Sequence, residues 1–250
     1  MQTFDITLPT SWTELNDSQL HLVYTLFAAD YTAAEVKALC LLKWNRLKVV
    51  ATLPNSLFMM KSSRRVFLVT SRQLCAAIAA LDFLDDFPPL PVRISRIGKH
   101  RAAAADFANV PFEQYLFVEN LFQGYLNTQQ LELLQQIAEV LYSSTHLKPT
   151  QAHLVGTFYW MASLKQYFAK EFPNFFKPAA QESDGNLLGT PHQSTYVQLR
   201  DSTNAMIRAL TGGDITKESR ILKMDTWRAL TELDAKAREA EELRKITKHH

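Results

Sequence analysis

The sequence predicts a mainly α-helical protein, a helical bundle with a small antiparallel β element in its N-terminal half. The first observation behind this prediction is the spacing of apolar residues between positions 111 and 172, which recur as on one face of a helix. The second is a change at residues 47–70, where short β-prone runs alternate with turn-forming residues. The third is composition: 47% of the 250 residues are hydrophobic and 21% are charged, as in globular proteins.

Two helices are expected before the β element, after a short strand at Thr3–Leu8. Each helix is begun by a polar residue with a glutamine or glutamate three positions later. The pairs are Asn16 with Gln19 and Thr32 with Glu35. This is the spacing of a capping box, in which both side chains bond to backbone N–H groups at the start of a helix.

The β element is predicted between about residues 47 and 97 as a hairpin or three-stranded patch. A helix is expected to interrupt it from residue 70 or 71 to about residue 84, before a proline-rich break at 87–91. Beyond the break, Val92–Ile97 alternates polar and apolar residues, which is typical of a half-exposed strand.

Three consecutive helices are predicted in the middle of the chain. They begin near Pro111, Asn127 and Thr150, and Pro173 ends the third. Short connections favour antiparallel packing, so we expect a bundle.

A change in composition divides the chain. Residues 1–176 are predicted to form the mainly helical body, and 177–193, rich in small and polar residues, a linker. Residues 194–250 are then a C-terminal helical appendage, in which one helix stops at Gly212–Gly213 and the last begins at Asp225.

The sequence contains no recognisable catalytic or cofactor signature. There are seven glycines and no glycine-rich phosphate loop. The two cysteines, Cys40 and Cys75, are expected to be buried free thiols, and the histidines do not share metal-ligand spacing. Asp82, Asp85 and Asp86 are interpreted as a solvated helix end. We therefore predict no catalytic residue, no metal ligand and no cofactor, and a protein that is not an enzyme.

The N-terminus has neither a basic region nor an apolar region of the kind that signal peptides have. No apolar run approaches the length of a membrane span. We expect a cytoplasmic protein without membrane contact.

Basic residues suggest nucleic-acid binding as an alternative function. The candidate contacts are Lys61, Arg64, Arg65, Arg93, Arg96 and Arg101. If the strands that carry them pair, one sheet face would be basic, with Phe58 and Phe67 near it. The other interpretation is that these charges protect a sheet edge from aggregation. The net charge of only +2 favours the latter.

The function that we prefer depends on contacts with other proteins. The last helix carries Trp227, Leu230 and Leu233 and then becomes highly charged around Leu243. A helix with such thin apolar cover is marginal alone, so these four residues are candidate partner contacts.

Two segments resemble proteins encoded in bacteriophage structural gene clusters. They are Ile6–Leu15, followed by Gln19 and Leu20, and Ala209–Lys217 together with Trp227, Leu230 and Leu233. The second segment resembles small helical proteins that include tail assembly chaperones. The resemblance implies a non-enzymatic role in virion or tail assembly. It also implies partners among phage structural proteins or other copies of this chain. The expected location is the host cytoplasm, with the assembled virion as a second place.

Overall fold

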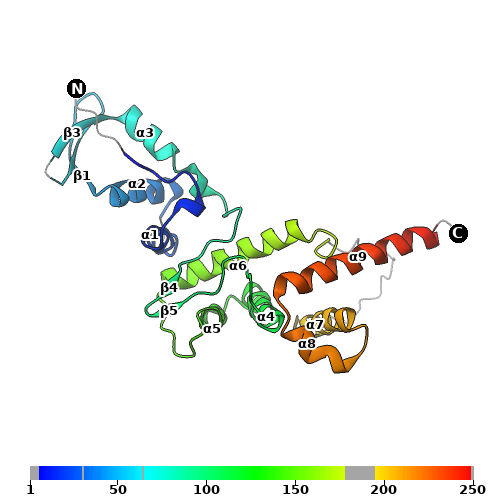
Figure 1. The fold of residues 1–250 in the computed structure, drawn as a ribbon. Helices are drawn as coiled ribbons and strands as arrows, with labels where there is room; N and C mark the ends of the chain where they lie inside the picture. Colours follow the sequence, from blue (N-terminus) through cyan, green and yellow to red (C-terminus); the bar gives the residue numbers. More distant parts are fainter. Residues whose placement is uncertain (1–5, 30, 64, 178–194, 249–250) are drawn as a thin grey trace, which may run out of the picture.

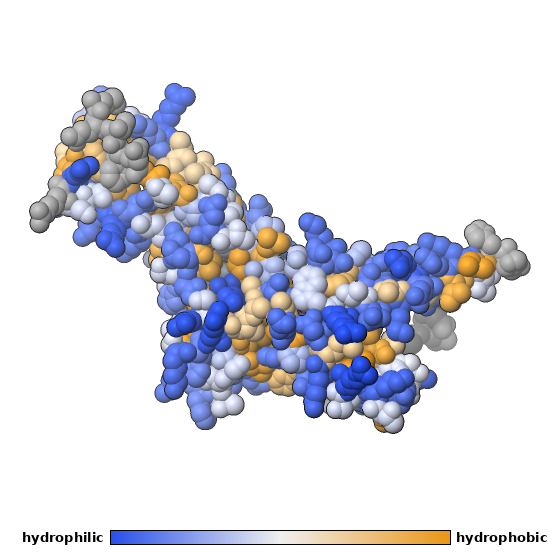
Figure 2. Space-filling view, viewed as in Figure 1, coloured by the Kyte–Doolittle hydropathy of each residue, from blue (hydrophilic) through white to orange (hydrophobic). Residues whose placement is uncertain are grey.

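The computed structural model describes residues 6–29, 31–63, 65–177 and 195–248. It confirms a mainly α-helical fold with a small antiparallel sheet in the N-terminal half. Figure 1 shows an elongated molecule in which an N-terminal lobe and a C-terminal lobe meet at helix α6 (Gln151–Glu171). The space-filling view has the same elongated outline (Figure 2).

The N-terminal lobe is built from helices and the three-stranded sheet. Its elements are η1 (Trp12–Glu14), α1 (Asp17–Phe27), α2 (Ala33–Trp44), β1 (Leu47–Leu53), β2 (Leu57–Ser62), β3 (Arg65–Thr70), α3 (Ser71–Ala79) and η2 (Asp82–Asp85). Both predicted capping boxes are present, and Thr70 with Gln73 forms a third at the start of α3. Residues 6–8 are not in a strand, which corrects that part of the predicted N-terminal strand; residues 3–5 lie outside the described residues.

The three strands form an antiparallel sheet in the order β1-β2-β3, as the β-prone runs predict. The register pairs Met60 with Val49 on one side and with Phe67 on the other. A bulge between Val49 and Ala51 shifts β1 by one residue. Asn55, with φ of 60°, lies in the left-handed conformation that Asn tolerates at tight turns.

The C-terminal lobe contains a short hairpin and the remaining helices. Its elements are β4 (Arg96–Ile97), β5 (His100–Arg101), α4 (Phe112–Thr128), α5 (Leu131–Leu141), α6, α7 (Thr195–Thr211), η3 (Ile215–Lys217), α8 (Glu218–Leu222) and α9 (Thr226–Lys248). Pro111 and Thr150 precede α4 and α6 as predicted, and α6 ends before Pro173. The predicted start at Asn127 is wrong, because α4 continues to Thr128 and closes at Gln129, whose φ is 57°.

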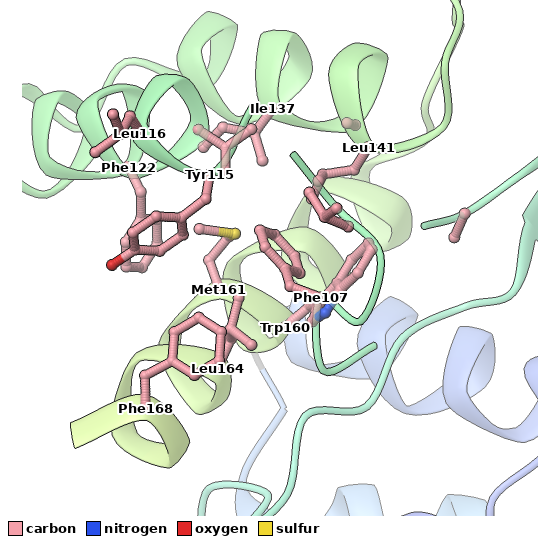
Figure 3. Close-up of a cluster of buried hydrophobic side chains, with 14 of the residues drawn as sticks. Phe107, Tyr115, Leu116, Phe122, Ile137, Leu141, Trp160, Met161, Leu164 and Phe168 are labelled. Atoms are coloured by element: carbon pink, nitrogen blue, oxygen red, sulfur yellow. The ribbon is translucent and has the colours of Figure 1, made fainter. Parts of the chain in front are cut away.

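The larger hydrophobic core lies where α4, α5 and α6 meet (Figure 3). Phe107 is fully buried at its centre, with its ring centroid 5.9 Å from that of Trp160 and 6.3 Å from that of Tyr115. Two indole groups hold the loop that carries Phe107: Trp160 Nε1 donates to Ala105 O and Trp227 Nε1 to Asp106 O, both at 2.7 Å. Tryptophans from α6 and α9 therefore fix the loop that carries the buried Phe107.

Helix α9 belongs to this core at its N-terminal end. Ala229 and Leu230 are fully buried in it, and the backbone N–H of Thr226 donates to Val110 O at 2.9 Å. The predicted linker lies outside the described residues except for Lys177. The boundary between body and appendage stays a prediction. Helix α9 lies beyond that boundary and packs on the helices of the body.

The smaller core joins the N-terminal lobe to α6. Trp12, Tyr24, Cys40 and Leu81 are buried in it, together with Ala152 from α6. Helices α1 and α6 approach closely because α6 has a glycine at the contact. A Cβ atom added to Gly156 would lie 2.9 Å from Cδ2 of Tyr24.

We predict that Gly156→Ala destabilises the fold. Alanine would favour the helix by about 1 kcal/mol. The new methyl group would collide with the Tyr24 ring, and overpacking costs about 1–3 kcal/mol. Chemical denaturation should therefore show a net loss of up to about 2 kcal/mol in the free energy of unfolding.

Gly124→Ala in α4 is the matched control. Its nearest contact would be Leu133 Cδ1 at 3.2 Å, the end of a flexible side chain, so this variant should be as stable as the wild type or more so. Equal stability of the two variants would contradict the close α1–α6 contact.

Candidate interaction surface

Aliphatic side chains cover the exposed face of the β1–β3 sheet. Along β3, Val66 and Leu68 alternate with Phe67 and Val69, so they share a face. Their exposed fractions are 53% and 56%, high for aliphatic residues in the middle of a strand. The register adds residues from the other strands, and we call the set the outer sheet face: Lys48, Ala51, Leu53, Leu57, Met59, Lys61, Val66 and Leu68.

The opposite face of the sheet is turned toward the lobe. Leu47 and Met60 lie on it and are only 6% and 2% exposed. A sheet that is apolar on both faces is typical of strands covered on both sides. Within the described residues the outer sheet face is not covered in this way, so its aliphatic side chains contact solvent.

The chain around this face is strongly basic. Residues 36–81 contain no aspartate or glutamate. They contain eight cationic residues: Lys37, Lys43, Arg46, Lys48, Lys61, Arg64, Arg65 and Arg72. Since the whole chain has a net charge of +2, this segment at +8 leaves −6 for the rest. Residues 1–35 contain five acids and no lysine or arginine, and three aspartates follow at 82–86, so the basic character is local to this segment.

A second exposed apolar surface lies near the end of α9. Leu243 and Ile246 are 65% and 60% exposed. Figure 2 shows apolar residues at both ends of the molecule, over the sheet and toward the C-terminal end of α9.

The residues proposed as nucleic-acid contacts do not form one surface. Lys61 and Arg65 are exposed on the β1–β3 sheet, and Arg64 lies outside the described residues. Arg96 and Arg101 face each other across the separate β4–β5 hairpin. The condition on which this alternative depended, pairing of the two basic segments in one sheet, is therefore not met.

Local contacts explain the separate hairpin. Gly98, with φ of 58°, makes its tight turn. Ile94 is buried, and its carbonyl accepts a hydrogen bond from Tyr142 Oη at 2.6 Å. Arg93 donates through Nε to Ala103 O, and its guanidinium lies 5.9 Å from the Trp160 ring centroid. Arg93 is thus held by its own lobe.

The candidate partner contacts on α9 divide in two. Leu230 is fully buried and Leu233 is 3% exposed in the larger core, and Trp227 packs beside them with its indole N–H bonded to Asp106. These three are corrected from partner contacts to core contacts, because the first turns of α9 lie against the chain's own helices. Leu243 is exposed.

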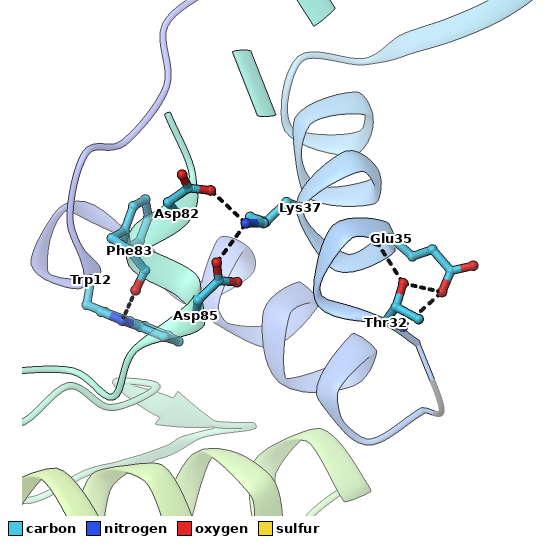
Figure 4. Close-up of polar contacts among 7 residues, drawn as sticks. All are labelled: Trp12, Thr32, Glu35, Lys37, Asp82, Phe83 and Asp85. Atoms are coloured by element: carbon cyan, nitrogen blue, oxygen red, sulfur yellow. Dashed lines mark hydrogen bonds and ion pairs between the residues drawn. The ribbon is translucent and has the colours of Figure 1, made fainter. Parts of the chain in front are cut away.

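The acidic residues after α3 bind a lysine that the sequence analysis did not single out (Figure 4). Lys37 Nζ lies 2.6 Å from Asp82 Oδ1 and 2.7 Å from Asp85 Oδ2. These hydrogen bonds, first that to Asp82, raise the pKa of Lys37. The interpretation as a solvated helix end is thus incomplete, since two of the three carboxylates tie η2 to α2. In the sequence, the signal that could have indicated this contact was a lysine among the apolar residues of α2.

His21 and His153, which the sequence does not place together, meet where α1 contacts α6. Their ring centroids lie 5.1 Å apart, and the backbone N–H of Thr150 donates to His153 Nδ1 at 3.0 Å. Burial, and then the nearby His21, lower the pKa of His153. In the described part of the chain, no group of three or more His, Cys, Asp or Glu could hold a metal ion. Cys40 is buried as expected, whereas Cys75 is exposed on α3.

A cavity of about 590 Å³ lies between α4, α7 and α9. Its polar wall is on α4, where Glu119 accepts hydrogen bonds from Gln123 and Lys165, both at 2.7 Å. Phe175 and Met206 are among the apolar residues opposite. Because the polar wall is largely bonded to its own neighbours, the cavity offers mainly apolar contacts.

No protein-family model, curated protein or solved structure matches the chain. Of the helices in the described residues, none has the length and apolar character needed to cross a membrane. The candidate site that the geometry supports best is the outer sheet face with the cations around it, because its aliphatic side chains are exposed.

We predict that Lys37→Met lowers the free energy of unfolding by on the order of 1–2 kcal/mol. Methionine keeps the packing of the buried stem but loses both charged hydrogen bonds, and solvent screening of the half-exposed carboxylates limits the cost. Lys43→Met, exposed on the same helix, is the control and should change stability by less than about 0.5 kcal/mol. Urea denaturation measures both, and equal effects would contradict a structural role for Lys37.

Proposed function

We propose that the protein is a non-enzymatic binding protein that acts through contacts with other proteins in bacteriophage virion or tail assembly. The observation that carries the proposal is the outer sheet face, where Val66 and Leu68 expose more than half of their surface. Contiguous exposed apolar residues mark surfaces that bind a partner. The assembly role, and a location in the host cytoplasm with the virion as a second place, rest on a resemblance to phage structural-cluster proteins. The segments that carry it are Ile6–Leu15 with Gln19 and Leu20, and Ala209–Lys217 with Trp227, Leu230 and Leu233.

The chemistry of the face favours a protein partner. Fully covering an aliphatic side chain stabilises a contact by about 1.5–3 kcal/mol, so two half-exposed side chains supply a moderate affinity. The surrounding cations add little affinity in water but accelerate encounter with an acidic partner. An aliphatic centre with charged surroundings is the usual anatomy of a protein interface.

Nucleic-acid binding is the second candidate. The eight cations and absent acids of residues 36–81 favour it. Stacking of bases requires exposed aromatic rings. The register places Phe58 and Phe67 on the face opposite to Leu68, and Arg93, Arg96 and Arg101 belong to another hairpin. This arrangement ranks nucleic acid below protein.

The test is co-purification with the protein products of the neighbouring genes, expressed together with the tagged chain. Val66→Thr/Leu68→Thr keeps β-prone residues but removes the aliphatic surface. This variant should bind its partner at least tenfold more weakly, which corresponds to about 1.4 kcal/mol.

Leu131→Gln is the control, since Leu131 is 50% exposed on α5, away from the sheet. It should bind like the wild type. If both variants bind equally, or if the purified chain binds a twenty-residue oligo-dT at physiological salt and no protein, the proposed function is contradicted.

A further inference from the structure

The end of α9 presents one face that combines acidic and aliphatic side chains. Glu239, Glu242, Leu243 and Ile246 occupy positions i, i+3, i+4 and i+7, which lie together on one side of a helix. All four are exposed. We call these four residues the tail face.

The opposite side of α9 is held by the chain's own residues. Leu230 and Leu233 enter the larger core from that side. Further along, Glu241 binds Lys177 at 3.0 Å and Lys245 at 3.3 Å. Glu239 and Glu242, in contrast, make no ion pair with any described residue, so the tail face is available to another molecule.

The tail face complements the outer sheet face in both polarity and charge. Leu243 and Ile246 match the aliphatic centre formed by Met59, Val66 and Leu68. The two glutamates match Lys48 and Lys61, which lie directly opposite each other across β1 and β2 without an acidic neighbour. Such like-charged cross-strand pairs are unfavourable alone, and a partner carboxylate between them relieves the repulsion.

We propose that the tail face of one copy of this chain docks on the outer sheet face of a second copy. The inference rests on the proposed function, because it names the partner of the same sheet surface. Local charge supports a second copy as partner, because the tail face carries Glu239 and Glu242 while the outer sheet face carries lysines and no acid. A head-to-tail arrangement brings these glutamates to the lysines, whereas a sheet-to-sheet dimer would oppose the lysines of two copies.

The two faces lie at opposite ends of the molecule, as Figure 1 shows for the β1–β3 sheet and the C-terminal end of α9. They therefore cannot meet within one chain. A contact between different surfaces is heterologous, and each added copy leaves one free face of each kind. Such a contact makes rings when the rotation closes and filaments when it does not, which suits a protein that builds an assembly.

Sedimentation velocity of the full chain tests the proposal at concentrations up to about 0.1 mM, because one helix face makes a small interface. The average mass of the wild type should rise with concentration beyond that of a dimer, and fall in high salt. The sheet variant, Val66→Thr/Leu68→Thr, and the tail variant, Leu243→Gln/Ile246→Gln, should each be monomeric.

The decisive sample is an equimolar mixture of the two variants. The sheet variant retains a working tail face and the tail variant retains a working sheet face, so the mixture should form dimers and nothing larger. Glu239→Lys/Glu242→Lys should also be monomeric alone and should regain association when mixed with Lys48→Glu/Lys61→Glu. Circular dichroism of each variant confirms that it is folded.

The head-to-tail contact is overturned if the wild type stays monomeric at about 0.1 mM. It is also overturned if the wild type associates but the mixture of the two variants stays monomeric. Association that both variants retain also overturns it. The tail variant distinguishes failure of self-association from failure of the proposed function. If this variant still binds a neighbouring gene product through the outer sheet face, the proposed function stands without self-association. Dissociation of the wild-type assembly by oligo-dT would mark nucleic acid as the occupant of the sheet and would also overturn it.

Discussion

The contact between α1 and α6 is the constraint on which the rest of the structure depends. Helix α6 enters both hydrophobic cores, the smaller through Ala152 and the larger through Trp160, Met161 and Leu164. This double use requires α1 to lie almost against the α6 backbone, which the missing side chain of Gly156 allows. A single helix therefore contributes side chains to the cores of both lobes.

This shared helix sets where the exposed surfaces lie on the molecule. The sheet and the end of α9 are held apart by packed helices, so the glutamates of the tail face cannot reach the lysines of the outer sheet face within one chain. Tryptophan side chains maintain the arrangement at the C-terminal end, where Trp160 and Trp227 fix the loop around Phe107. Aliphatic side chains that find no cover in their own lobe, such as Leu68, then become available to a partner.

Local interactions were predictable from the sequence, and contacts between distant segments were not. The capping boxes at Asn16 and Thr32 involve residues three positions apart, so spacing alone predicted them. Lys37 meets Asp82 across 45 positions, and the pattern around each residue contains no trace of the other. The β4–β5 hairpin was misassigned because alternation predicts a strand but not its neighbour. The outer sheet face was missed for a related reason: only the observed register shows that Val66 and Leu68 share the exposed face.

Hydrogen exchange along α6 tests most directly whether one helix unites the two lobes. Amides between Gly156 and Leu164 should exchange only through global unfolding. Peptides from α1 and α4 should then lose protection together as denaturant is added, although they belong to different cores. Complete exchange of α1 and α2 while α4 and the second half of α6 remain protected would contradict the account, because the lobes would then unfold independently.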